Sequence, residues 1–153
     1  MIVGIHHVAI GTPDLKRALA FYRDVLGFEV VQESDWHRDN PLADQAVGLP
    51  NTSARMAMLR APNAFLEVWE YREPEPRDLT SRPSDLGYPH FALQVDDIQA
   101  EFDRLSAAGM EFVADAPVAF GDAASAVYGR DPFGNVIEIY EIHDKEIAQL
   151  TRT

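Results

Sequence analysis

The sequence predicts an α+β fold made of two βαβββ modules, and an internal duplication is the main reason. The stretch 4–10 returns as 87–93 after a shift of 83 residues, and the stretch 65–71 returns as 136–142 after a shift of 71. Repeats of this kind indicate duplicated units of supersecondary structure. In addition, strand-like and helix-like hydrophobic periods alternate in the same order in both halves. The chain is therefore expected to form the same small unit twice.

The duplication also pairs chemically active side chains. It superposes His7 on His90 near the start of each half, and Glu67 on Glu138 near the end of each half. Each module thus opens with a strand that carries a histidine and closes with a strand that carries a glutamate.

In the first half, a β-branched, loosely alternating run predicts a strand over Val3–Ile10. Thr12 or Asp14 can cap the helix that follows, and Gly27 is expected to end it. The remaining elements expected here are strands at 28–32, 55–60 and 64–71, a loop at 35–41 and a short helix at 42–47. The segment 33–52 is the least legible part of the chain.

The second half repeats this order. Asp96 and Asp97 can cap a helix that begins at Ile98 and stops at Gly109. Strands are expected at 91–95, 110–114, 124–130 and 136–142. The predicted organisation is a first module at 1–71, a proline-rich linker at 72–86, a second module at 87–143 and a polar tail at 144–153.

Composition narrows the class of protein. The chain has 153 residues and a formal net charge of −12, which argues against nucleic acid or an anionic membrane as a partner. It contains no cysteine, so any metal must be bound by nitrogen and oxygen ligands. No apolar run approaches the roughly 18 residues of a membrane helix, and no signal peptide is recognised. We therefore expect a cytoplasmic protein with a small-molecule substrate.

Several motifs resemble those of the vicinal-oxygen-chelate superfamily. They are His6-His7-Val8-Ala9-Ile10 with Pro13-Asp14-Leu15, the helix that ends in Val25-Leu26-Gly27-Phe28, and Asp131-Pro132-Phe133-Gly134-Asn135-Val136-Ile137-Glu138. The superfamily includes glyoxalase I, methylmalonyl-CoA epimerase, extradiol dioxygenases, and fosfomycin- and bleomycin-resistance proteins. The resemblance covers nearly the whole chain except 33–52 and the tail. It implies a glyoxalase-like fold in which two modules form a cup-shaped mixed sheet around a divalent metal, and it implies a homodimer.

Carried over by the resemblance, the metal ligands are His7, Glu67, His90 and Glu138. Two imidazoles and two carboxylates suit Ni, Co, Mn, Fe or Zn, and ligand type alone does not choose among them. Glu67 and Glu138 are also the expected catalytic bases, because a carboxylate can move a proton α to a carbonyl group. The sequence does not distinguish the two glutamates. It also leaves open whether the modules of one site belong to one chain or to two exchanging partners.

Strand alternation predicts which side chains share the face of these ligands. The expected substrate-binding residues are Phe65, Trp69, Tyr88 and Tyr140, with Trp36 and Tyr128 as weaker candidates. Glu70 and Glu141 lie three residues past the ligands, so we expect them on the opposite face, in solvent. Of the other histidines, His6 is expected to be structural, and His37 and His143 are expected at the surface.

Three hypotheses for function follow. The first is a lyase, isomerase or epimerase that stabilises an enolate of a small oxygenated carbonyl compound by metal chelation. The second is an Fe(II)-dependent extradiol-type dioxygenase, which the aromatic pocket favours. The third is a non-catalytic binding protein like those of bleomycin resistance. The His/Glu/His/Glu set favours the first.

The sequence departs from individual families at two places. Gly11 stands where bacterial glyoxalase I has an arginine. No acid stands where methylmalonyl-CoA epimerase has its base glutamate, and Asp44 is the nearest acid to that position.

Overall fold

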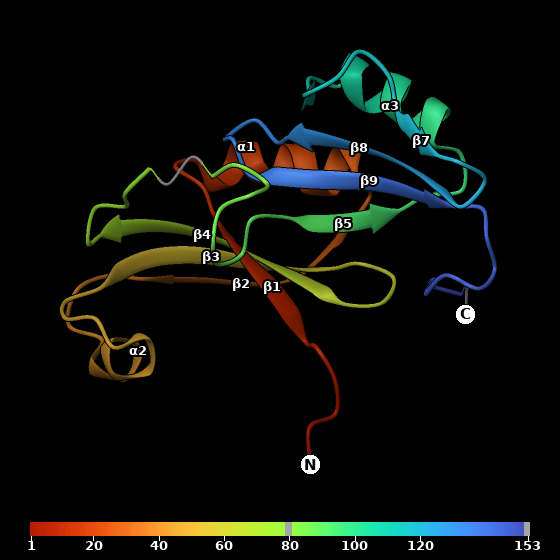
Figure 1. The fold of residues 1–153 in the computed structure, drawn as a ribbon. Coiled ribbons are helices and arrows are strands. Elements are labelled where there is room, and N and C mark those ends of the chain that lie inside the picture. The colour runs from red at the N-terminus through yellow and green to blue at the C-terminus, as the bar shows by residue number, and fades with distance from the viewer. Residues whose placement is uncertain (79–80, 152–153) are drawn as a thin grey trace. The chain divides into compact units, whose positions relative to one another are not determined.

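The structure, a computed structural model, describes residues 1–78 and 81–151. It divides into two compact units with the boundary between residues 79 and 80 (Figure 1). Residues 79–80 of the expected linker and 152–153 of the expected tail lie outside the described residues. Each unit packs helix against a sheet that combines parallel and antiparallel strand pairs, so the predicted α+β class is confirmed.

Unit 1 contains a four-stranded sheet with the strand order β1-β4-β3-β2 among its described residues. In chain order its elements are β1 (His7–Gly11), α1 (Leu15–Leu19), η1 (Ala20–Val25), β2 (Glu29–Trp36), α2 (Pro41–Val47), β3 (Ser53–Arg60) and β4 (Phe65–Glu73). β1 runs parallel to β4, whereas the β2–β3 and β3–β4 pairs are antiparallel. The helix α2 connects β2 to β3 at one end of the sheet (Figure 1).

Two strand boundaries differ from the sequence prediction. β1 begins at His7 instead of Val3, because its parallel partner β4 begins at Phe65, which lies opposite His7. β2 continues to Trp36, beyond the predicted end at residue 32, because β3 supplies partners as far as Ala54. The added residues are mostly polar, so their sequence alone does not indicate a strand. They adopt the strand conformation because they pair with β3. The predicted short helix at 42–47 is confirmed as α2.

The helical segment after β1 changes its winding. Asp14 caps α1 by accepting a hydrogen bond from the backbone N–H of Arg17, as the sequence allowed. From Ala20 the chain continues as a π-helix instead of the single regular helix that the spacing suggested. The wider turn accompanies the burial of two consecutive aromatic residues, Phe21 and Tyr22.

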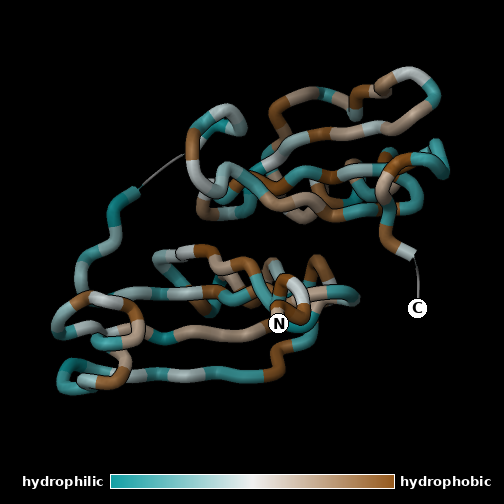
Figure 2. The backbone as a smooth tube through the Cα atoms, turned by 60° about the horizontal axis from the view of Figure 1, so that its bottom comes forward, coloured by the Kyte–Doolittle hydropathy of each residue, from teal (hydrophilic) through white to brown (hydrophobic). Residues whose placement is uncertain are grey.

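α1 contacts β3 and β4, and this contact defines the two faces of the unit 1 sheet. Leu66 and Val68 of β4 are buried on the helix-covered face. Glu67 and Trp69 alternate with them and therefore lie on the opposite face, which we call the distal face. In Figure 2 the edge strand β2 is largely hydrophilic and its neighbour β3 largely hydrophobic, in agreement with their burial.

Unit 2 has the strand order β5-β9-β8-β6 among its described residues, and β7 also pairs with β8. Its elements are β5 (Phe91–Gln94), α3 (Ile98–Ala107), β6 (Glu111–Phe112), β7 (Val118–Phe120), β8 (Ala124–Arg130) and β9 (Val136–Ile142). The predicted α3, β5, β8 and β9 are confirmed. β6 is shorter than predicted, and the sequence analysis missed β7, which has only three residues.

At Gly129, near the end of β8, an added side chain would crowd two neighbouring side chains. A Cβ atom there would lie 2.5 Å from Met110 Cε and 2.9 Å from Phe112 Cδ1. Phe112 in turn packs against Phe102 of α3, with ring centroids 4.5 Å apart. The missing side chain is thus a packing requirement on the helix-covered face of the unit 2 sheet.

Candidate active site

In unit 1, strand pairing brings His7 to Glu67. The parallel register places Ala9 opposite Glu67, so His7 is its diagonal neighbour on the same face. His7 Nε2 lies 3.6 Å from Glu67 Oε2, and the glutamate side chain is only 14% exposed against 40% for the histidine. The two residues that the duplication singled out therefore face each other across β1 and β4.

An aromatic row holds this glutamate in place. Trp69 donates its indole N–H to Glu67 Oε2 at 2.6 Å. The Trp69 ring stacks on Tyr71 at 5.4 Å and meets Trp36 edge-on at 5.3 Å. Trp36 is itself anchored, because it donates to Thr52 Oγ1 at 3.1 Å. Trp36 thus lies beside the candidate site, although it comes from the segment that the sequence made least legible.

His6 is also placed by contacts in this region. Its Nδ1 lies 2.9 Å from Nδ1 of His7, and its ring stacks on Phe65 at 4.9 Å. One of these ring nitrogens can donate a hydrogen bond to the other, in roles that depend on the tautomers of the two rings. His6, which was expected to be structural, therefore has a defined contact, because its ring lies against the imidazole of His7.

Unit 2 repeats the pair but surrounds it differently. His90 Nε2 lies 3.3 Å from Glu138 Oε2. Tyr128 of β8 lies opposite Glu138 in the register and edge-on to His90, with ring centroids 5.1 Å apart. Burial raises the pKa of Tyr128, and the charge of Glu138 and a hydrogen bond to it add to the shift. The group that contacts Glu138 is therefore a phenol from the neighbouring strand, whereas the indole that contacts Glu67 comes from the same strand as the glutamate.

Each pair has the spacing of two ligands of one ion. Ligands bonded at about 2.1 Å and separated by roughly 90–110° lie about 3.0–3.5 Å apart, close to the two observed distances. Among residues 1–78 and 81–151, no third histidine, aspartate or glutamate gathers with a pair to form a complete metal cluster. Each unit by itself thus offers two donors, one nitrogen and one oxygen.

The other predicted substrate residues fall into two groups. Phe65, Trp69 and Tyr140 lie on the strands that carry the ligand pairs, half-buried. Tyr88 is fully exposed and precedes β5, which begins at Phe91. Strand alternation therefore does not extend to Tyr88, and contrary to the prediction it does not place Tyr88 on the face of the ligand pair.

Glu70 and Glu141 correct a second expectation. Both lie on the face opposite the ligands, as predicted, but helices cover this face, and both carboxylates accept hydrogen bonds instead of facing solvent. Glu70 accepts a hydrogen bond from the backbone N–H of Leu15 at 2.5 Å, and Glu141 accepts one from Ile98 at 2.9 Å. These are the first residues of α1 and α3, whose N–H groups have no partner inside the helix. At equivalent positions of the two units, Glu70 and Glu141 thus attach the start of a helix to the sheet.

Asp44, the acid nearest the position of the epimerase base, is fully engaged elsewhere. Its carboxylate accepts hydrogen bonds from the hydroxyl and N–H of Thr52, at 2.6 and 2.7 Å, and from the N–H of Asn51 at 2.7 Å. The bonds from Thr52 lower the pKa of Asp44. Its contacts are those of a residue that closes the turn between α2 and β3.

Two methionines of the distal face were not predicted. Met58 lies opposite Glu67, and Met56 lies opposite Trp69. Both are buried. Strand alternation within 55–60 could have found them, because they lie two residues apart on a predicted strand. They supply an adaptable apolar floor beside the pair.

Comparison with known proteins agrees with the fold. The profile of the Glyoxalase/Bleomycin resistance protein/Dioxygenase superfamily matches residues 4–139. The chain is 34% identical over 154 residues to a 2-epi-5-epi-valiolone epimerase from Actinomyces sp., covering 92% of this chain and 80% of that protein. It is 29% identical over 145 residues to an ethylmalonyl-CoA/methylmalonyl-CoA epimerase from Cereibacter sphaeroides, covering 93% and 100%. The crystal structure of a glyoxalase family protein from Bacillus cereus matches with a TM-score of 0.82 and 22% identity, over 94% of this chain and 97% of that one.

The fold and the sequence matches define an enzyme of the glyoxalase-like class. The chain belongs to the Glyoxalase/Bleomycin resistance protein/Dioxygenase superfamily. Relatives named as epimerases and as a lactoylglutathione lyase make it an enzyme of the isomerase or lyase type. None of the helices in the described residues is long and apolar enough to cross a membrane.

Proposed function

We propose that this enzyme is a divalent-metal-dependent epimerase or related isomerase, which moves a proton on the carbon next to a carbonyl group of a small oxygenated substrate. The observation that carries the proposal is the repetition of one His–Glu pair at the same place in both units. The names of the relatives favour epimerisation, and a lyase would use the same first step.

In this proposal His7, Glu67, His90 and Glu138 together hold one ion of Ni, Co, Mn, Fe or Zn. Their donor atoms suit such ions, and the spacing within each pair fits adjacent ligand positions. The ion supplies positive charge that stabilises the negative oxygen developing on the substrate as the proton leaves. The site forms within one chain or between the two chains of a homodimer.

The two glutamates differ in their partners, and this suggests a division of labour. The indole of Trp69 can only donate, so it holds Glu67 Oε2 as an acceptor. The hydroxyl of Tyr128 can donate or accept, and it can keep its bond to Glu138 whether or not that carboxyl carries a proton. We therefore assign proton removal to Glu138. Glu67 or water returns the proton on the other face of the substrate.

The substrate contacts proposed for this reaction are aromatic. Trp36, Phe65 and Trp69 would contribute from unit 1, and Tyr128 and Tyr140 from unit 2. Tyr88 keeps a substrate role in this proposal only if a ligand or a second chain covers it. Such a wall suits a substrate with an apolar face beside its oxygens.

Metal analysis tests the proposed ligand set. Purified protein, His7→Ala and His90→Ala would be compared with His37→Ala, a control histidine outside both pairs. We expect one divalent ion per chain in the wild type and the control, and loss of metal in both ligand variants. Metal that survives Glu67→Ala but not His7→Ala would mean a three-ligand site, and oxygen uptake with a catechol panel would then test the dioxygenase.

Proton exchange tests the reaction itself. In D₂O, an epimerase replaces the hydrogen next to the carbonyl by deuterium, which removes its NMR signal. For a panel of α-hydroxy ketones and acyl thioesters we expect exchange that falls about 10²–10⁴-fold in Glu138→Gln. Glutamine keeps a carbonyl oxygen for the ion but cannot act as the base, so exchange that is lost while metal is retained is assigned to the missing base. Absence of exchange across the panel with metal present contradicts the proposal.

A further inference from the structure

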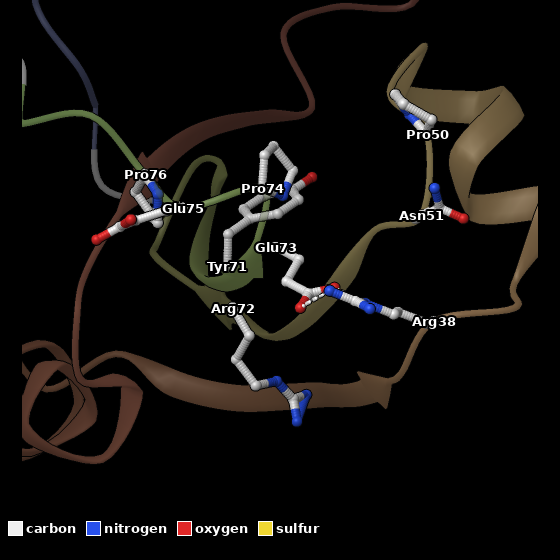
Figure 3. Close-up of a pocket in the computed structure, with 9 residues that line it drawn as sticks. All are labelled: Arg38, Pro50, Asn51, Tyr71, Arg72, Glu73, Pro74, Glu75 and Pro76. Carbon is white, nitrogen blue, oxygen red and sulfur yellow. Dashed lines mark hydrogen bonds and ion pairs between the residues drawn. The ribbon is translucent and has the colours of Figure 1, made fainter.

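A second feature of unit 1 lies outside the proposed metal chemistry. An open pocket of about 660 Å³ lies where β4 ends (Figure 3). Its walls come from the end of β4 and the prolines after it, from the turn at Pro50 and Asn51, and from Arg38. The volume lies within the range of small-molecule sites.

The pocket continues the face that carries the candidate active site. Tyr71, which lines it, lies four residues beyond Glu67 on the same strand, and alternation places both on the distal face. At about 3.3 Å per residue the two positions are roughly 13 Å apart. The Trp69 ring, stacked on Tyr71, fills the interval. The pocket can therefore receive a part of a substrate that does not react.

The charges of the pocket argue against an anionic ligand. Arg38 binds both carboxylate oxygens of Glu73, and this pair is drawn in Figure 3. Arg72 binds Asp35. Each guanidinium that lines the pocket is thus matched by a carboxylate, and Glu75 adds a further acid. A phosphate or carboxylate would have to displace Glu73 and approach other negative charges.

The remaining wall suits a ring that carries hydroxyl groups and has one apolar C–H face. Tyr71 and the prolines 50, 74 and 76 present apolar surface. Proline backbone offers carbonyl acceptors but no N–H donor, and the carboxylates are acceptors as well. A ligand that complements this wall must mainly donate hydrogen bonds, while one apolar face stacks on the phenol ring. Arg38 and the side-chain amide of Asn51 add donors for the ligand's own oxygens.

We propose that this pocket binds a neutral polyhydroxylated ring, a sugar or a carbocyclic polyol, as the non-reacting part of the substrate. The connection to the reacting carbonyl group rests on the proposed function. The preference of the pocket for a neutral polyol over an anion does not.

Matched neutral and phosphorylated probes test this preference. ¹⁵N-labelled protein would be titrated with glucose, glucose 6-phosphate, myo-inositol and inositol 1-phosphate, and followed by NMR. We expect the amide signals of Asn51, Tyr71 and Arg72 to shift with the neutral probes, with dissociation constants on the order of 1–10 mM, as for other small fragments. The phosphorylated probes should bind at least about fivefold more weakly.

Two variants locate the binding. Arg38→Ala should weaken the neutral probes at least about fivefold, because it removes a donor of the pocket. Arg60→Ala is the control: Arg60 also forms an exposed ion pair, with Glu29, but does not line the pocket, so binding should be unchanged. No shift with the neutral probes, tighter binding of the phosphorylated ones, or equal binding by Arg38→Ala and wild type would each overturn the proposal.

The same titration in His7→Ala separates this inference from the proposed function. We expect polyol binding to be unchanged in that variant. Binding that persists while the wild type takes up no metal would uphold the pocket and reject the metal chemistry. Polyol binding that disappears in a folded His7→Ala would place the ring at the ligand pair and reject the pocket.

Discussion

Removing the carboxylate of Glu70 should destabilise unit 1 far more than removing an exposed carboxylate would. Glu70 Oε2 accepts hydrogen bonds from the N–H of Leu15 at 2.5 Å and from Arg55 Nη2 at 2.8 Å. The Glu70 side chain is 13% exposed, and Leu15 is buried. Glu70→Ala would leave the first N–H of α1 without its acceptor and Arg55 without its closest charge.

The magnitude follows from these two contacts. A hydrogen bond to a charged group contributes about 1.5–3 kcal/mol to stability. Without Glu70, the buried N–H of Leu15 has lost this acceptor, and an unsatisfied buried donor lowers stability. The ion pair with Arg55, whose side chain is 42% exposed, adds at most about 1 kcal/mol after solvent screening. We therefore expect Glu70→Ala to lower the free energy of unfolding by about 2–4 kcal/mol. Glu141→Ala removes one helix contact without an arginine partner and should cost about 1–3 kcal/mol.

Urea unfolding followed by circular dichroism would measure both variants. Glu29→Ala is the matched control, since Glu29 also pairs with an arginine but both side chains are more than half exposed. Its effect should stay within about 0.5 kcal/mol. If Glu70→Ala behaved like Glu29→Ala, the argument that Glu70 fastens α1 to the sheet would be refuted.

Three further outcomes are expected. Gly129→Ala should cost about 1–3 kcal/mol in urea unfolding by overpacking, whereas Gly4→Ala, in open space, should be nearly neutral; equal effects would contradict the packing argument. NMR titration should find the pKa of Asp44 below its ordinary value, because Thr52 donates hydrogen bonds to its carboxylate. The ionised carboxylate then stabilises the fold above the unfolded pKa of about 3.9, and this contribution disappears as the pH falls through the folded pKa. The difference in the free energy of unfolding between wild type and Asp44→Asn should therefore shrink in acid. In an ultraviolet pH titration, the tyrosine ionisation step that is present in the wild type and absent from Tyr128→Phe should have its midpoint above the ordinary pKa of tyrosine. A normal midpoint would contradict the burial of this phenol.

The duplication made much of the site predictable. His7 and Glu67 lie on strands that the local pattern identifies, and alternation correctly assigns Glu67 and Glu70 to opposite faces. Alternation also has a limit, because it holds only where a strand exists. It failed at Tyr88, which precedes the first hydrogen-bonded residue of β5.

Partners far along the chain could not be predicted in the same way. The sequence places Glu70 on the face opposite Glu67 but does not show that a helix covers this face or that Glu70 reaches the N–H of Leu15, 55 positions away. It likewise does not show that β3 extends β2 to Trp36, so that this indole can meet Trp69. Both outcomes depend on strand register, which is set by packing of the whole sheet.

By itself, the sequence determined the repeated α+β units, the strands that carry His7, Glu67 and Glu138, and the family, whereas His90 lies just before β5. These features follow from local periodicity and from a duplication that is visible residue by residue. Only the tertiary structure decided that an indole holds Glu67 while a phenol holds Glu138, and that Glu70 and Glu141 fasten helices instead of facing water. The physical reason is that a hydrogen bond forms between groups that register and packing bring within about 3 Å, whatever their separation in the chain.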